Sequence, residues 1–80
     1  MKATLEFDLD DGQDRMAHLR CIKAVKMAIT LWDMDQYLRS HIKYAPDTAD
    51  EKTVEVLQEV RDKLREFMSE NSIDLDELIN

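Results

Sequence analysis

The chain has 80 residues, a net charge of −7, and only one cysteine, one glycine and one proline. This length predicts a single domain, residues 1–80, with a small core, and one cysteine excludes an internal disulfide framework. A composition of 44% apolar and 36% charged residues indicates a helix-rich folded protein. Because neither disulfides nor a metal-ligand pattern reinforces so small a core, we expect a homo-oligomer, a dimer or higher.

The charge is distributed unevenly along the chain. Residues 1–14 have a net charge of −4, residues 15–44 of +4, and residues 45–80 of −7. The overall acidity argues against direct binding of nucleic acid, which requires a basic surface. No apolar run is long enough to span a bilayer, and the N-terminus lacks the continuous apolar stretch of a signal peptide. We therefore expect a cytoplasmic protein that does not contact the membrane.

The first predicted element is a short β-strand over residues 3–9. Apolar and polar residues alternate there with a period of two, as on a strand with one buried face. The apolar positions are Ala3, Leu5, Phe7 and Leu9. The chain offers no second strand, so this strand would have to pair with another protomer or with the sheet edge of a partner.

A long helix is predicted over residues 13–44, starting near Asp10, Asp11 or Asp14. Its apolar residues fall on two nearly opposite faces. One face contains Met16, Met27, Leu31, Met34, Leu38 and Ile42, and the other contains Cys21, Ile22, Val25, Ile29 and Trp32. One partner helix cannot cover both faces, so either the helix bends or its second face packs against another protomer.

A second, antiparallel helix is predicted over residues 49–70, with Thr48 and Glu51 as a capping box and Asn71 as the C-cap. Its apolar stripe comprises Val54, Leu57, Val60, Leu64, Phe67 and Met68. Over residues 72–80 we predict a short turn or helix that docks on the rest of the protein and is capped by Ser72 or Asp74. The expected fold class is thus mainly α: a short N-terminal strand, a helical hairpin and a C-terminal turn or helix.

Three groups of residues are candidates for binding. In the expected oligomer interface, apolar residues are followed by an amide and a guanidinium side chain, a combination typical of interface hot spots. Its residues are Ile22, Val25, Ile29, Trp32, Gln36 and Arg39. A candidate anion or nucleotide site comprises Arg20, Lys23, Lys26, Tyr37, Lys43 and Tyr44, which could converge between protomers. An acidic face comprises Glu51, Glu55, Glu59, Asp62, Glu66 and Glu70, either as a solvated surface relieved by Lys52, Lys63 and Arg65 or as a mimic of a phosphate backbone.

Catalytic chemistry is not indicated by any of these patterns. Asp33 and Asp35 point in different directions on a helix, and we expect Asp35 to pair with Arg39 one turn later. Cys21 follows His18 by one turn, but we expect it to be a buried, inert thiol. One glycine excludes the phosphate-binding loops, and no metal-ligand or cofactor motif occurs. The expected protein is therefore not an enzyme and has no catalytic, metal or cofactor-binding residues.

Two stretches, "KATLEFDLDD" and "LWDMDQYLRSHIKY", resemble a group of small tailed-phage proteins that have a "KATLxFxLP"-like strand and an "ALWxxDxxLRxxxKY"-like helix. The matching residues of the second stretch are Leu31, Trp32, Asp35, Leu38, Arg39, Lys43 and Tyr44. The sequence departs from the pattern at Asp10, where a proline is common. The resemblance implies a phage protein in the cytoplasm of an infected bacterium, without implying a mechanism.

We therefore expect a phage-encoded protein that binds and inhibits a host protein, foremost an antiphage immune component. Two alternatives remain. One is an oligomeric sponge that sequesters a nucleotide immune signal between protomers. The other is an acidic nucleic-acid mimic that blocks a nucleic-acid enzyme.

Overall fold

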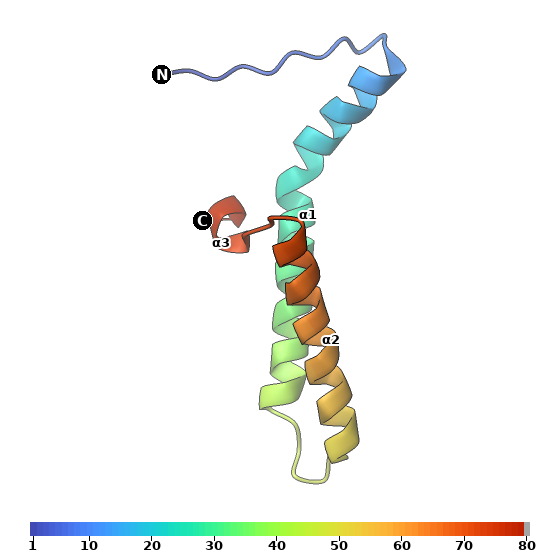
Figure 1. The fold of residues 1–80 in the computed structure, drawn as a ribbon, viewed down its shortest axis with the longest axis vertical. Helices are drawn as coiled ribbons and strands as arrows, with labels where there is room; N and C mark the ends of the chain where they lie inside the picture. Colours follow the sequence, from blue (N-terminus) through green and yellow to red (C-terminus); the bar gives the residue numbers. More distant parts are fainter. Residues whose placement is uncertain (80) are drawn as a thin grey trace.

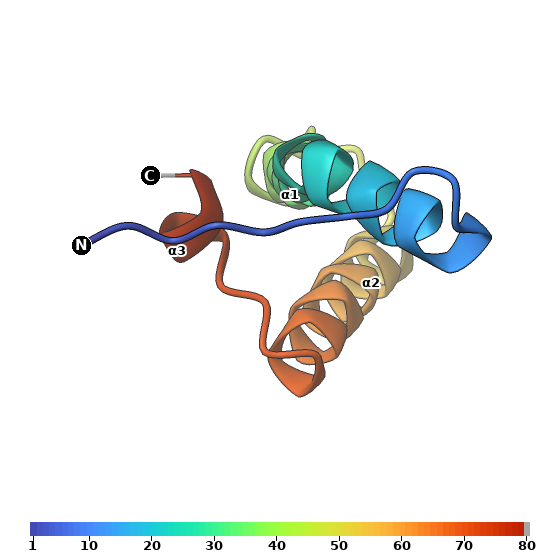
Figure 2. The same cartoon turned by 90° about the horizontal axis from the view of Figure 1, so that it is seen from above.

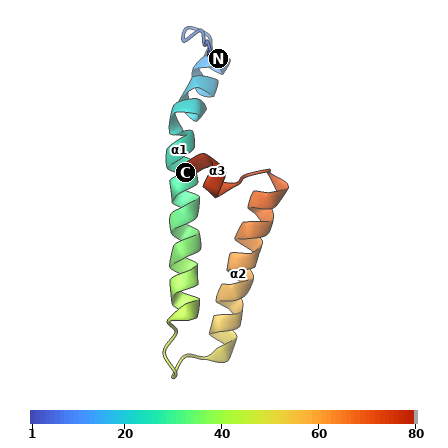
Figure 3. The same ribbon diagram turned by 90° about the vertical axis from the view of Figure 1, so that its left-hand side faces the viewer.

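The computed structural model describes residues 1–79 as a chain of three helices: α1 (Gly12–Lys43), α2 (Glu51–Glu70) and α3 (Leu75–Ile79). Helices make up 72% of the described residues, so the predicted mainly α fold with a long helix and a second helix is confirmed. α1 and α2 form an antiparallel hairpin joined at one end by residues 44–50, and α3 returns toward α1 from the other end of α2 (Figures 1 and 3).

The start of α1 is fixed by a turn rich in aspartates. Asp11 is the N-cap, as expected, although its side chain does not cap the helix. The carboxylate of Asp14 instead accepts a hydrogen bond from the backbone N–H of Asp8 at 2.9 Å, and the Phe7 ring lies 5.5 Å from the His18 ring. These contacts tie residues 7 and 8 to the first turns of α1.

The predicted strand over residues 3–9 is wrong for the single chain. Residues 1–7 are extended, but no strand forms anywhere in residues 1–79. Figure 1 shows this N-terminal segment leaving the start of α1 at a wide angle, with no other extended segment beside it. A strand is defined by its hydrogen-bonded neighbour, and the described part of the chain supplies none.

α2 begins two residues later than predicted. Its N-cap is Asp50, whose carboxylate accepts a hydrogen bond from the backbone N–H of Lys52 at 3.1 Å. The expected Thr48–Glu51 capping box is therefore wrong, because an aspartate closer to the helix takes the cap position. At the other end Asn71 is the C-cap, as predicted, and its side-chain amide donates to the carbonyl of Phe67 at 2.8 Å.

The turn between α2 and α3 redirects the chain toward α1. Ser72 adopts a positive φ of 57°, the left-handed conformation that commonly ends helices. Asp74 then caps α3, since its carboxylate accepts hydrogen bonds from the backbone N–H groups of Asp76 and Glu77 at 3.0 and 3.4 Å. The predicted C-terminal element capped by Asp74 is confirmed.

The hydrophobic core is small. Within residues 1–79, the buried apolar residues are Ala28, Leu38 and Met68. The radius of gyration is 17.8 Å, whereas a compact domain of this length has about 12 Å. The molecule measures 57 × 30 × 19 Å, so much of its apolar surface has no cover from its own chain.

The N-terminal third of α1 is the least covered part. It extends beyond α2 and α3 and curves away from the hairpin axis (Figures 1 and 3). In the view from above, the N-terminal segment and α3 lie on the same side, while α2 lies apart (Figure 2). No helix within residues 1–79 combines the length and apolarity needed to cross a membrane.

Candidate interaction surface

A buried ion-pair cluster joins the two long helices. Asp35 of α1 is only 3% exposed, and its Oδ1 accepts hydrogen bonds from Arg61 Nε at 3.0 Å and from Arg65 Nε at 3.3 Å. Its Oδ2 accepts from Arg61 Nη2 and from Gln36 Nε2, both at 3.3 Å. The two arginines lie one turn apart on α2, so both guanidinium groups reach one carboxylate.

The charge of Asp35 is stabilised inside this cluster. Burial by itself raises the pKa of Asp35, because desolvation disfavours the carboxylate. The hydrogen bond and charge of Arg61, together with those of Arg65, outweigh burial and lower the pKa of Asp35 from its ordinary value of 3.8. Asp35 is therefore an ionised structural anchor, which does not suit it to act as a general acid or base near neutral pH.

The expected Asp35–Arg39 pair is wrong, and the sequence analysis missed Arg61. In the structure α1 turns Asp35 toward α2, in line with Ala28, Leu31 and Leu38. Arg61 lies in the corresponding line of α2, between Leu57 and Leu64. Asp35 and Arg61 each occupy a position in the apolar stripe of their helix. A charged residue in each of two facing apolar stripes is the sequence pattern that could have predicted this ion pair.

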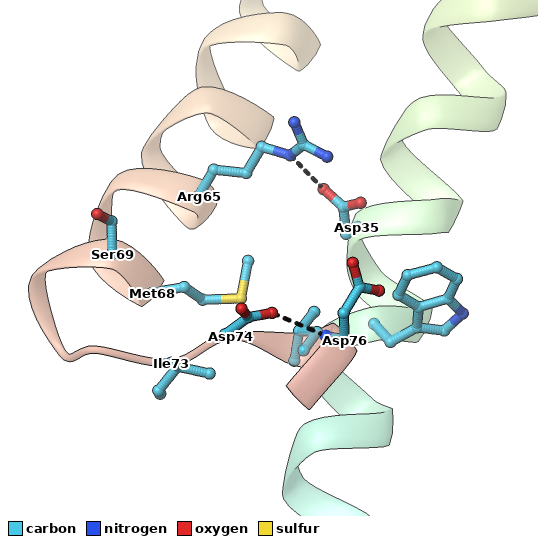
Figure 4. A pocket seen from close by; sticks show the side chains of 9 residues that line it. Asp35, Arg65, Met68, Ser69, Ile73, Asp74 and Asp76 are labelled. Atoms are coloured by element: carbon cyan, nitrogen blue, oxygen red, sulfur yellow. Dashed lines mark hydrogen bonds and ion pairs between the residues drawn. The ribbon is translucent and has the colours of Figure 1, made fainter. Parts of the chain in front are cut away.

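A C-terminal pocket of about 440 Å³ opens beside the cluster. Figure 4 shows Arg65 and Met68 reaching into it from α2, with Asp35 opposite and Asp74 and Asp76 at the side of α3. Ser69 of α2 also lines the pocket. Trp32 of α1, 40% exposed, also lines it. α3 thus brings carboxylates close to the only tryptophan, an arrangement that the sequence did not reveal because it depends on the Ser72 turn.

A hairpin groove of about 410 Å³ lies elsewhere between α1 and α2. Its lining is almost entirely apolar, and charged groups stand at its edge. The lining residues are Met34, Leu38, Glu59, Val60, Lys63, Leu64 and Phe67. Met34, Val60 and Phe67 are about half exposed, although Val60 and Phe67 belong to the predicted buried stripe of α2. The stripe is shifted because Arg61, rather than Val60, faces α1.

The predicted interface residues divide between two surroundings. Ile22, Val25 and Ile29 lie on the uncovered surface of α1, with 61%, 57% and 41% exposure, and Arg39 is also exposed. Gln36 is half-buried against Asp35 and belongs to the ion-pair cluster. Cys21 is exposed, so the expected buried thiol is wrong: neither α2 nor α3 reaches this part of α1.

The candidate anion residues do not converge in one copy of the chain. Lys23 and Lys26 share a basic hollow of about 470 Å³ with Met27, Thr30 and Leu31. Tyr37 instead contacts His41, with 4.4 Å between ring centroids, and Lys43 Nζ lies 5.5 Å from the Tyr44 ring centroid. With about 1.5 Å of rise per residue, Lys26 and Tyr37 are separated by roughly 16 Å along α1. Arg20 is exposed nearer the N-terminus.

The acidic face of α2 is solvent-exposed along its whole length. The six residues Glu51, Glu55, Glu59, Asp62, Glu66 and Glu70 are all exposed. Lys63 pairs with Glu66 at 3.1 Å, and Gln58 donates to Asp62 at 2.8 Å. Arg65 does not relieve this face as expected, because its guanidinium turns toward Asp35. Glu59 is shared between the acidic face and the hairpin groove.

We examined the described residues for a metal site and for a His18–Cys21 pair. Within residues 1–79 no three His, Cys, Asp or Glu side chains are grouped so that they could hold a metal ion. His18 packs against Phe7, and no hydrogen bond between His18 and Cys21 occurs in this part of the chain.

Comparison with known proteins supplies no relative. No protein-family model matches the chain, and no curated protein or solved structure matches it either. The functional interpretation consequently depends on the surfaces described above.

Proposed function

We propose that this protein is a non-catalytic interaction module that works as a homo-oligomer and binds another protein. One observation carries the proposal: within residues 1–79 only three apolar residues are buried, whereas 18 large apolar side chains are exposed. Monomeric soluble proteins rarely leave so much apolar surface in contact with water, and large exposed patches commonly mark protein interfaces. Self-association accounts for the uncovered part of α1, and a different surface remains for a partner.

The hairpin groove is the surface we assign to the partner. Its half-exposed floor of Met34, Val60 and Phe67 supplies apolar contact area, and Glu59 connects it to the acidic face. Apolar centres surrounded by charged rims are the usual composition of hot spots. The rim holds one acid, Glu59, and one base, Lys63, and Glu59 continues into the acidic face of α2. This face favours a partner with basic residues beside its apolar anchor, because complementary charges speed association and exclude wrong partners.

The resemblance to tailed-phage proteins supplies the biological setting of this proposal. We propose that the chain is phage-encoded, acts in the cytoplasm of the infected bacterium and inhibits a host protein, foremost an antiphage immune component. The resemblance supplies the setting, and the hairpin groove supplies a surface suited to a protein target.

A phage-plating assay in bacteria that carry an antiphage system tests this proposal. Expression of the wild-type protein should raise plating efficiency by about tenfold or more, an effect that Phe67→Asp should abolish because a charge in the groove blocks apolar contact. Val56→Asp, which changes another exposed apolar residue of α2 outside the groove, is the matched control. If Phe67→Asp inhibited as well as wild type while remaining helical and oligomeric, the groove would not be the binding surface.

A nucleotide sponge is a second candidate, favoured by one observation. Lys23 and Lys26 lie at the same hollow, which gives two cations for an anion, whereas the Thr30 hydroxyl there already donates to the Lys26 carbonyl at 2.9 Å. Protein purified gently from bacteria and then denatured by heat would release a nucleotide detectable by its absorbance if the sponge were correct. Absence of nucleotide, with inhibition intact, would favour the protein-binding function.

A further inference from the structure

We infer that the hairpin groove and the basic hollow form one continuous docking surface, and that its occupant is an amphipathic helix of the partner protein with one acidic and one basic end. This inference rests on the proposed function of the hairpin groove. It adds the shape and the charge of the segment that binds there. The bound helix completes a three-helix bundle with α1 and α2.

The groove and the hollow share one apolar stripe of α1. Met27 and Leu31 line the basic hollow, and Met34 and Leu38 line the hairpin groove. Residues spaced by four, three and four positions lie on one face of a helix, and these four residues have that spacing. With about 1.5 Å of rise per residue, the stripe from Met27 to Leu38 is roughly 16 Å long. The hollow therefore extends the groove along α1.

Side chains of α2 widen this stripe into a trough. Val60 and Phe67 of α2 line the groove together with Met34 of α1. These three residues and Met27 in the hollow are all about half exposed. Half-exposed apolar side chains on two adjacent helices leave a row of gaps into which the side chains of a third helix can pack.

The occupant has to satisfy its own backbone hydrogen bonds. The docking surface belongs to two α-helices, whose backbone groups are paired within each helix. It therefore offers no sheet edge to which an extended segment could add as a strand. A helix pairs its own backbone and presents anchors at i, i+4, i+7 and i+11, which matches the spacing of the stripe on α1.

The charged residues of the surface lie at its two ends. α2 runs antiparallel to α1 (Figure 3), so Phe67 lies toward the hollow, whereas Val60 and Glu59 lie toward the connection of the hairpin. Lys23 and Lys26 stand at the hollow, nearer the N-terminus of α1. One end of the surface thus carries two lysines, and the other end carries Glu59.

These end charges are available to a partner. Within residues 1–79, Lys23 and Lys26 have no carboxylate partner and Glu59 has no basic partner. Lys63 also lines the groove, but its charge is paired with Glu66 at 3.1 Å. A complementary helix has carboxylates at the end that meets the two lysines and a lysine or arginine at the end that meets Glu59.

Fluorescence anisotropy with a labelled synthetic peptide and the full-length protein tests the charges. The probe is a helical peptide of about 18 residues, long enough to cover the stripe, with leucines at the stated spacing, glutamates at one end and lysines at the other. Lys23→Glu with Lys26→Glu should raise the dissociation constant of this peptide by about tenfold, because like charges then face each other. A second peptide with lysines at both ends should prefer this variant to wild type. Lys2→Glu with Lys43→Glu changes the net charge equally at other exposed sites and should leave binding unchanged.

Single charges in the two parts of the stripe test its continuity. Phe67→Asp alters the groove and Met27→Asp alters the hollow, and both residues are exposed enough that we expect helical circular dichroism to be retained. Each variant should raise the dissociation constant by about tenfold or more, because a charge replaces an apolar contact. Val56→Asp, outside both regions, should not.

The outcomes separate this inference from the proposed function of the groove. Loss of binding in Phe67→Asp but not in Met27→Asp would leave the groove as a binding site and overturn its extension into the hollow. Equal binding of a peptide with a central proline, which cannot form a continuous helix, would overturn the helical occupant. If no peptide bound wild type saturably, the inference would be wrong, while the plating assay with Phe67→Asp would still decide the proposed function.

Discussion

At the residue scale, Asp35 determines how the two long helices meet. A carboxylate buried to 3% exposure is tolerated only when its charge is compensated, and Arg61 and Arg65 provide that compensation from α2. Arg61, the less exposed of the two arginines, faces the core, whereas Arg65 remains largely in solvent. The cluster therefore fixes the register of the hairpin through one main pair and one supporting contact.

Removal of the buried carboxylate should destabilise the protein strongly. We expect Asp35→Ala to lower the free energy of unfolding by about 3 to 5 kcal/mol, because Arg61 is left as an uncompensated partly buried charge. Replacing both partners, as in Asp35→Leu with Arg61→Leu, should recover most of this loss, since an apolar pair leaves no unpaired charge. Denaturant unfolding at one fixed protein concentration measures both effects. An equal loss in the single and double variants would show that the pair does not anchor the hairpin.

The same pair should make stability depend on pH in acid. Because folding lowers the pKa of Asp35 from 3.8, the contribution of the ionised carboxylate is present above that value and is lost as pH falls through the folded pKa. The stability difference between wild type and Asp35→Asn should therefore stay constant from about pH 7 to about pH 5 and shrink below about pH 4. Thermal unfolding at a series of pH values measures the difference. A gap that persisted unchanged in acid would argue against an ionised Asp35.

At the element scale, α3 completes the C-terminal pocket although it has only five residues. A helix this short is not stable alone, so its docking depends on its cap and its contacts with α1. The Asp74 cap and the Ser72 turn supply the local conformation. Trp32 and Leu75 line the same pocket, which makes the only tryptophan a reporter of α3.

Loss of the α3 cap should loosen this element without unfolding the hairpin. We expect Asp74→Ala to cost about 1 kcal/mol of local stability, with faster hydrogen exchange in residues 75–79 and a red shift of Trp32 fluorescence. Asp74→Ser keeps a capping oxygen and is the matched control. Unchanged exchange and fluorescence in Asp74→Ala would show that α3 is held by its packing alone.

Local patterns in the sequence predicted the elements better than their contacts. The long helix, the second helix, the Asn71 C-cap and the Asp74 cap depend on nearby residues, and the structure has them. The Asp35–Arg61 pair depends on a contact between residues 26 positions apart in the sequence. A strand over residues 3–9 would need a neighbouring strand, and the described residues contain none. The C-terminal pocket required the path of the turn at Ser72, which no residue pattern specified.

At the scale of the whole molecule, the described chain is elongated and leaves much of its apolar surface exposed. The radius of gyration of 17.8 Å, the three-residue buried apolar core and the uncovered end of α1 all indicate missing apolar cover. The charge distribution places an acidic segment, residues 8–14, directly before a basic segment, residues 15–26, around the start of α1. We propose that self-association covers the exposed apolar residues of α1 and leaves the hairpin groove for a protein partner.

The most direct measurement is native mass spectrometry of the full-length protein purified gently from bacterial cells. We expect a symmetric oligomer with no small-molecule adduct, as the proposed self-associating, protein-binding module requires. An oligomer carrying a mass of nucleotide size would instead support the sponge. A stable monomer across the accessible concentrations would contradict the proposal that the uncovered surface of α1 is an interface.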